Sequence, residues 1–182
     1  MPLLPGEILN QRYRIVNLMA AGSYGATYRA YDIKDERHYA IKEYLDASPE
    51  IQKRFRTEAR SLTQLSHPQL ATFRDHFALE GVGQYLVSDY VDGVDLQSLI
   101  DQYGPLPSDL IIGWLQSACD PLAYLHKRGV LHLNIKPANL RLTAAATIFL
   151  VDTGLPGLGV RPHTDGYGAP EQQAQKIGRA HV

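Results

Sequence analysis

The sequence has one cysteine, no long apolar run and almost no net charge, and each shortage excludes a class of protein. A single thiol, Cys119, rules out an intrachain disulfide and fits a reducing compartment. No apolar stretch approaches the ~20 residues of a membrane helix, and residues 1–10 lack the basic and apolar regions of a signal peptide. The net charge of -1 gives no reason to expect nucleic acid as a partner. We therefore expect a cytoplasmic protein without a membrane segment.

Short runs rich in β-branched and aromatic residues fill the first half of the chain, and helical spacing dominates the second half. Strands are predicted over residues 13–19, 26–31, 38–45, 73–80, 84–90, 140–143 and 147–151. A helix is predicted from an N-cap at Ser48 to about Leu65, and two more over 96–102 and 108–128. The predicted class is α+β, with a β-rich domain over 1–90 and a helical one over 91–176.

The helix predicted from Ser48 carries a carboxylate on its apolar stripe. Glu58 falls at helical spacing with Phe55 and Leu62. A carboxylate on a packed face must find a cation or bear a large desolvation cost, and Lys42 in the third strand is the natural partner. From these residues alone, an ion pair and a solvated Glu58 at the edge of the stripe are equally supported.

The segment HLNIKPAN, residues 132–139, resembles the protein-kinase catalytic loop His-Arg-Asp-x-Lys-x-x-Asn. His132, Lys136 and Asn139 match the pattern. Leu133 stands in the place of the Arg, and Asn134 in the place of the catalytic Asp. The chain thus resembles a kinase whose proton-accepting carboxylate has become an amide.

Further kinase motifs follow in order along the chain. Gly22 and Gly25 resemble the glycine-rich loop that covers the phosphates, although Ala20 replaces its first glycine. Asp152 resembles the first residue of the Asp-Phe-Gly motif, with Thr153 in place of the Phe. A tight hairpin turn and an ordinary Asp-Thr-Gly turn are the plain alternatives, and the ordered spacing of the motifs disfavours both.

Two further segments resemble parts of a kinase: the hinge, near the middle of the chain, and the activation segment, near its end. The backbone of Asp89 and Val91 matches the hinge that would bind adenine, and Arg141 stands where many kinases have an apolar residue beneath it. Thr164 and Glu171 match the conserved Thr and the Ala-Pro-Glu element of the activation segment.

The resemblance, closest to bacterial Ser/Thr protein kinases, covers roughly residues 13–171. It implies a bilobal protein-kinase-like fold with a complete β-rich N-lobe and a partial helical C-lobe. It also implies ATP and Mg²⁺ as cofactors and a protein substrate or regulated protein partner. By resemblance, the nucleotide is held by Gly22, Gly25, Lys42, Asp89 and Val91. The metal is held by Asn139 and Asp152, and the catalytic positions are Asn134, Lys136, Lys42 and Glu58.

Three functions fit these motifs. The leading interpretation is an ATP-binding domain impaired in catalysis, because Asn134 cannot take the proton of a substrate hydroxyl. The first alternative is an active Ser/Thr kinase that transfers the γ-phosphoryl group to protein hydroxyls. The second is an interaction scaffold that binds no nucleotide, which Ala20 and Arg141 favour.

The last residues, 177–182, are expected to be a non-native tail. They can be encoded by ATC GGA AGA GCA CAC GTC, which resembles a sequencing-adapter read. Since kinase domains usually run to about 250 residues, the chain is interpreted as a fragment. An ordinary polar C-terminal tail is the alternative.

Overall fold

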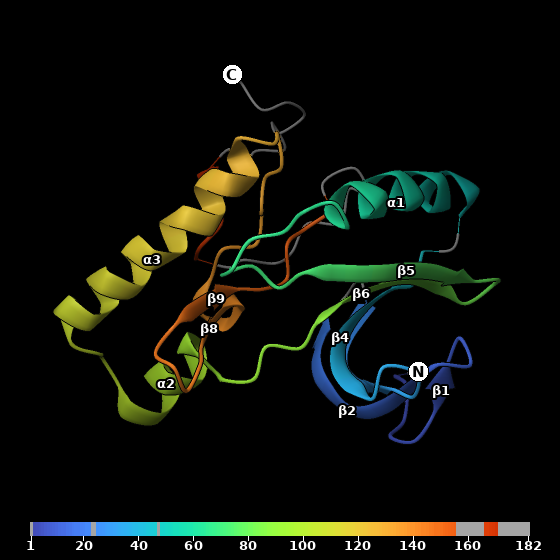
Figure 1. Cartoon of the computed structure of the whole chain (residues 1–182), viewed down its shortest axis with the longest axis horizontal. Coiled ribbons are helices and arrows are strands. Elements are labelled where there is room, and N and C mark those ends of the chain that lie inside the picture. Colours follow the sequence, from blue (N-terminus) through green and yellow to red (C-terminus); the bar gives the residue numbers. More distant parts are fainter. Residues whose placement is uncertain (1, 23–24, 47, 156–165, 171–182) are drawn as a thin grey trace. The chain divides into compact units, whose positions relative to one another are not determined.

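A computed structural model describes residues 2–22, 25–46, 48–155 and 166–170 of the chain (Figure 1). The chain divides into two compact units. Unit 1 comprises Met1–Leu65 and Thr72–Tyr90, and unit 2 comprises Ser66–Ala71 and Val91–Val182.

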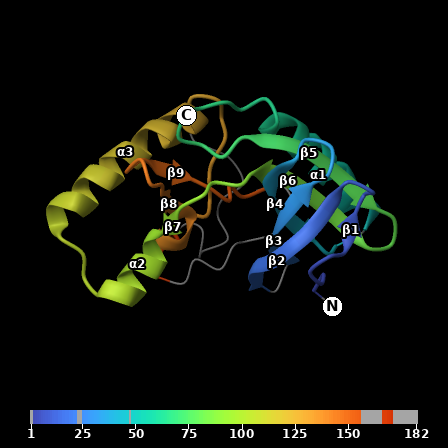
Figure 2. The same ribbon diagram turned by 60° about the horizontal axis from the view of Figure 1, so that its bottom comes forward.

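Unit 1 is built on a six-stranded antiparallel sheet with the strand order β1-β2-β3-β4-β6-β5. Its strands curl around an apolar interior (Figure 2). The strands are β1 Ile8–Leu9, β2 Tyr13–Gly22, β3 Gly25–Asp32, β4 Arg37–Tyr44, β5 Phe73–Leu79 and β6 Gly83–Asp89. The five strands predicted for this region are confirmed.

Alternation along the strands divides the side chains of unit 1 between two faces. On the inner face, Tyr28, Ile41 and Tyr85 are fully buried in one apolar cluster. Helix α1, Pro49–Leu62, packs on β5 and β6. Its Phe55 contacts the ring of Tyr44 at a centroid distance of 5.6 Å, so the outer face of the sheet is covered there.

The start of α1 differs in one detail from the sequence prediction. Ser48 is the N-cap residue, as predicted, but its side chain makes no capping hydrogen bond. Its backbone N–H instead donates to Asp46 Oδ1 at 2.9 Å. Proline at the first helical position lacks an N–H to satisfy, which lowers the demand for a side-chain cap. The helix ends at Leu62, three residues before the predicted end.

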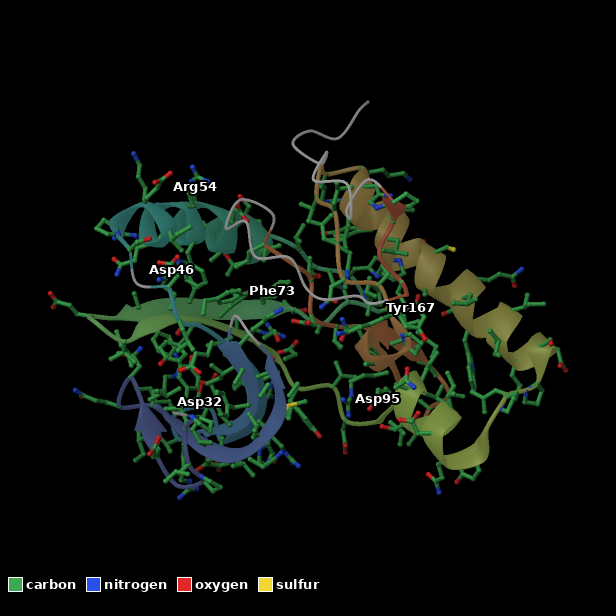
Figure 3. The ribbon with its side chains drawn as sticks, turned by 180° about the vertical axis from the view of Figure 1, so that it is seen from behind. Asp32, Asp46, Arg54, Phe73, Asp95 and Tyr167 are labelled. Atoms are coloured by element: carbon green, nitrogen blue, oxygen red, sulfur yellow. The ribbon has the colours of Figure 1, made fainter. Side chains whose placement is uncertain are left out.

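A buried carboxylate fixes the far end of β3. Asp32 is fully buried and accepts hydrogen bonds from Arg12 Nε at 2.8 Å and from the backbone N–H of Lys34 at 2.9 Å. Burial alone would raise the pKa of Asp32, but these hydrogen bonds outweigh it and lower the pKa. Figure 3 shows Asp32 among the curled strands, while Arg54 projects from α1 away from the sheet.

The described residues of unit 2 form two helices and a small sheet. Its elements are β7 Val94–Asp95, α2 Leu96–Tyr103, α3 Ser108–His126, a 3₁₀ turn Pro137–Asn139, β8 Leu140–Leu142 and β9 Ile148–Leu150. The antiparallel strand order is β7-β8-β9, and α3 packs along β9 (Figure 1). Asp95 caps α2 by accepting the N–H of Ser98 at 2.9 Å. The two predicted helices and two predicted strands are confirmed, as is the α+β class.

Helix α3 carries large apolar side chains that the described residues leave uncovered. Leu110, Ile112 and Leu115 are 49%, 55% and 49% exposed. The helix is nevertheless no membrane span, because no helix among the described residues is both long enough and apolar enough to cross a bilayer.

Candidate active site

The residues of the HLNIKPAN segment meet the end of β9 within unit 2. The side chain of His132 reaches Val151 O at 3.0 Å from Nε2, and the backbone N–H of Gly154 donates to His132 O at 2.8 Å. The backbone N–H of Val151 donates to Asn139 O at 3.1 Å. These hydrogen bonds fix the two segments against each other, although 18 residues of sequence separate Asn134 from Asp152.

The hydrogen bonds of His132 also define its tautomer. The backbone N–H of Asn134 donates to Nδ1 at 3.3 Å, so Nδ1 must carry a lone pair. The proton then lies on Nε2, which donates to the carbonyl of Val151. His132 is 2% exposed, so it supports the loop through these hydrogen bonds and does not face solvent as a base would.

Asn134 and Asp152 are in direct contact. Asn134 Nδ2 donates to Asp152 Oδ2 at 2.5 Å, and Asn134 is 1% exposed. An amide oxygen facing the carboxylate would be repelled, so the contact fixes which end of the amide points at Asp152. Asn134 Oδ1 is buried and has no hydrogen-bond partner among the described residues. A buried acceptor of this kind costs about 1–3 kcal/mol until a donor reaches it.

Asn139 is positioned by the same loop. Its Nδ2 donates to the backbone carbonyl of Asn134 at 2.7 Å, which directs the other end of the amide, Oδ1, away from that carbonyl. Asn139 Oδ1 and the carboxylate of Asp152 are hard oxygen donors of the kind that Mg²⁺ prefers. No group of three His, Cys, Asp or Glu residues gathers anywhere in the described part of the chain. The donor set therefore fits an ion that completes its shell with water and phosphate.

Two non-glycine residues of this region have left-handed backbone conformations. Leu133 has φ 60° and Asp152 has φ 61°. Each conformation costs on the order of 1–3 kcal/mol and persists only where surrounding contacts enforce it. Leu133 directly precedes Asn134, and Asp152 is itself part of the contact, so both strained residues lie at the candidate site.

In unit 1, Lys42 and Glu58 lie toward the same layer between the sheet and α1. Lys42 Nζ lies 5.6 Å from the ring centroid of Tyr44, and Tyr44 in turn packs on Phe55. Glu58 is one helical turn beyond Phe55 and is half-buried. The ion pair between Lys42 and Glu58 stays a prediction, which this shared layer supports.

The two glycines of the predicted phosphate loop have different surroundings. Gly22 pairs with Gly25 across β2 and β3, and a Cβ at Gly22 would meet no atom within 4 Å. At Gly25, φ is 145° and a Cβ would lie 1.9 Å from Glu43 O. The packing of β3 against β4 therefore requires glycine at position 25, whatever ligand the loop binds. Residues 23 and 24 lie outside the described residues.

The predicted hinge residues fall in different units. In unit 1, Asp89 is held by Arg74 through two hydrogen bonds of 2.7 Å, and its backbone N–H donates to Thr72 O at 2.9 Å. Val91 begins unit 2. Arg141, predicted to lie beneath adenine, donates to Gly93 O at 2.5 Å and so ties β8 to the start of unit 2.

Sequence reasoning missed a buried carboxylate inside unit 1. Glu43 is 4% exposed and accepts hydrogen bonds from Tyr28 Oη at 3.2 Å and Tyr85 Oη at 3.0 Å. Burial, reinforced by Glu43, raises the pKa of Tyr85. Strand alternation places Glu43 on the face opposite Lys42, and this is the sequence signal that could have indicated its burial. Its two partners could not be chosen without the fold.

Some predicted positions are not described. Thr164, Glu171 and the tail 177–182 lie outside the described residues. Lys136 is half-buried in the loop, where its backbone carbonyl accepts the N–H of Asn139 at 2.9 Å.

The fold and the candidate site together define a protein-kinase-like chain. Unit 1 is β-rich and carries Lys42 and a glycine hairpin. Unit 2 brings together the segments that contain His132, Asn139 and Asp152. Comparison with known proteins agrees. The family model described as "Protein kinase domain" matches residues 13–177. The chain therefore belongs to the protein kinase domain family, and its relatives place it with the bacterial Ser/Thr type.

Among curated proteins, the Ser/Thr-protein kinase PknB of Mycobacterium leprae is 31% identical over 153 residues, covering 81% of this chain and 25% of PknB. PknB of Mycobacterium tuberculosis H37Rv is 30% identical over 178 residues, covering 94% of this chain and 28% of PknB. The chain thus spans about a quarter of the length of these relatives. A crystal structure of a Cys-to-Ala variant of the Mycobacterium tuberculosis PknI kinase domain has a TM-score of 0.77 and 29% identity. It matches 100% of this chain and 70% of that one, which confirms the kinase fold.

Proposed function

We propose that this domain binds ATP and Mg²⁺ and is impaired in phosphoryl transfer. One observation carries the proposal: a buried amide, Asn134, stands where the family has its catalytic carboxylate, and it donates to Asp152. An amide cannot take the proton of an attacking hydroxyl. Loss of a general base costs about 10²–10⁴ in rate.

The remaining residues retain what nucleotide binding requires. Lys42 and Glu58 share a layer in unit 1, and Asn139 and Asp152 lie in the same hydrogen-bonded loop region in unit 2. Asn139 and Asp152 would hold Mg²⁺, which would neutralise negative charge on the phosphates.

Nucleotide binding is tested by the melting temperature of the chain with and without ATP and Mg²⁺. A ligand at a hundredfold its dissociation constant stabilises the folded state by about 2.7 kcal/mol, a shift of several degrees. Lys42→Met should reduce the shift, and an exposed lysine, Lys34→Met, serves as the matched control. If the wild-type chain shows no shift at any nucleotide concentration, the scaffold alternative replaces this proposal.

Impairment is tested by the turnover of the wild-type chain on a basic protein substrate with labelled ATP. Protein kinases typically turn over at about 1–100 s⁻¹. We expect a rate lower by about two to four orders of magnitude. A wild-type rate within the usual range would establish an active Ser/Thr kinase instead.

A further inference from the structure

We propose that the amide of Asn134 occupies the carboxylate oxygen of Asp152 that a divalent cation would coordinate, so that the Mg²⁺ bound with the nucleotide adds little to nucleotide affinity. The proposal rests on the nucleotide binding proposed above and specifies how the same site is regulated. In this proposal Asn134 not only lacks the carboxylate of a general base but also weakens metal binding at Asp152.

The geometry holds the side-chain amide of Asn134 in place as a hydrogen-bond donor to Asp152. Nδ2 lies 2.5 Å from Asp152 Oδ2, closer than the about 2.7–2.9 Å usual for an N–H donor and a carboxylate, so the two groups are in direct contact. Asn134 cannot readily turn away, because it is 1% exposed and its backbone is held at both ends. Its N–H donates to His132 Nδ1, and its carbonyl accepts from Asn139 Nδ2.

The charge of the site follows from the same contact. An aspartate at position 134 would put a second carboxylate next to Asp152. Two adjacent carboxylates repel each other and attract a divalent cation. With Asn134 the pair carries one negative charge, and the amide hydrogen already stabilises it. The demand for a cation at Asp152 is therefore reduced.

The contact also limits the oxygens available to a metal. An ion that coordinates Asp152 Oδ2 must displace the hydrogen bond from Asn134, because both need lone pairs of the same oxygen. The contact with Asn134 does not involve Asp152 Oδ1 or Asn139 Oδ1, which are also hard donors. Mg²⁺ demands near-ideal octahedral geometry and gives up its waters reluctantly, so a partly blocked carboxylate disfavours it.

The first test measures the dissociation constant of a fluorescent ATP analogue with Mg²⁺ and with EDTA. For the wild-type chain, Mg²⁺ should change the affinity by less than about threefold. Asn134→Asp should make binding depend on Mg²⁺ by about tenfold or more, since it removes the donor and adds a charge. Asn134→Ala removes the donor alone and should also increase the dependence. Asn10→Asp, which adds the same charge at an exposed position, should behave as wild type.

A second test uses the cation without nucleotide. Asn134→Asp should melt at a lower temperature than wild type in EDTA, and Mg²⁺ should restore part of the loss. Wild type and Asn10→Asp should be insensitive to the ion. A wild-type affinity that rises tenfold or more with Mg²⁺, or equal Mg²⁺ dependence in wild type and both Asn134 variants, overturns the proposal.

The two tests separate this inference from the proposed function. If nucleotide binds but strictly requires Mg²⁺, the role of Asn134 is wrong and nucleotide binding survives. If no variant binds nucleotide, the proposed function fails, and with it the part of the inference that concerns nucleotide affinity. The melting series still decides whether Asn134 replaces a cation at Asp152.

Discussion

Replacing Gly25 with alanine tests the structural role of glycine in the hairpin between β2 and β3. A Cβ at this position would lie 1.9 Å from the carbonyl oxygen of Glu43, where no side chain can give way. The backbone φ of 145° is also one that alanine avoids. Gly25→Ala therefore has to move β3 away from β4 or change the backbone at the turn.

The magnitude follows from these two penalties. A non-glycine residue in such a conformation costs on the order of 1–3 kcal/mol, and forcing atoms into packed space costs about 1–3 kcal/mol more. We expect the free energy of unfolding to fall by about 2–6 kcal/mol. At about 2–4 °C per kcal/mol for a chain of this size, the melting temperature should fall by at least several degrees.

The assay is thermal and urea unfolding followed by circular dichroism, with Gly22→Ala as the matched control. A Cβ at Gly22 would meet no atom within 4 Å. We expect Gly22→Ala to change stability by less than about 1 kcal/mol, because alanine lowers the chain entropy lost on folding. Equal stability of the two variants would refute the packing argument for Gly25.

Two further predictions concern buried polar groups of unit 1. The folded state lowers the pKa of Asp32, so its contact with Arg12 stabilises the fold at pH values above the unfolded pKa of about 3.9. This stabilisation is lost as the pH falls through the lower pKa of the folded state. Asp32→Asn should lower stability at pH 7 by about 1–3 kcal/mol and flatten the acid limb of a urea-midpoint titration; an unchanged limb would contradict this. Tyr85→Phe removes a donor from buried Glu43 and should cost about 1–3 kcal/mol in urea unfolding. The exposed Tyr103→Phe should be neutral, and equal effects of the two tyrosine changes would count against the buried network.

Local patterns predict the order of the longer elements but miss β1 and β7, which have two residues each. Alternation along 38–45 identified β4, and the spacing of Phe55 with Leu62 identified the buried stripe of α1. The end of α1 was placed three residues late, because Leu65 continues the apolar pattern after the helix has ended. Its N–H donates to Leu62 O in a turn. Periodicity detects the apolar face of a helix but not the hydrogen bonds at which the helix ends.

The candidate site shows where sequence reasoning stops. The motif spacing predicts that Asn134, Asn139 and Asp152 belong to one site. It could not show that the amide of Asn134 donates to Asp152, because that contact joins residues 18 apart through the hydrogen bonds of His132. Gly25 was assigned to phosphate binding on its motif, whereas its surroundings show a packing requirement as well. Such contacts depend on the tertiary fold.

The most direct test of the central claim is the rate of phosphoryl transfer by the wild-type chain and by Asn134→Asp, measured side by side with labelled ATP and Mg²⁺. If the amide at position 134 limits catalysis, the variant should transfer phosphate about 10²–10⁴ times faster than wild type, while Asn10→Asp should show no gain. Equal rates in wild type and Asn134→Asp, with both chains folded and binding nucleotide, would contradict the account.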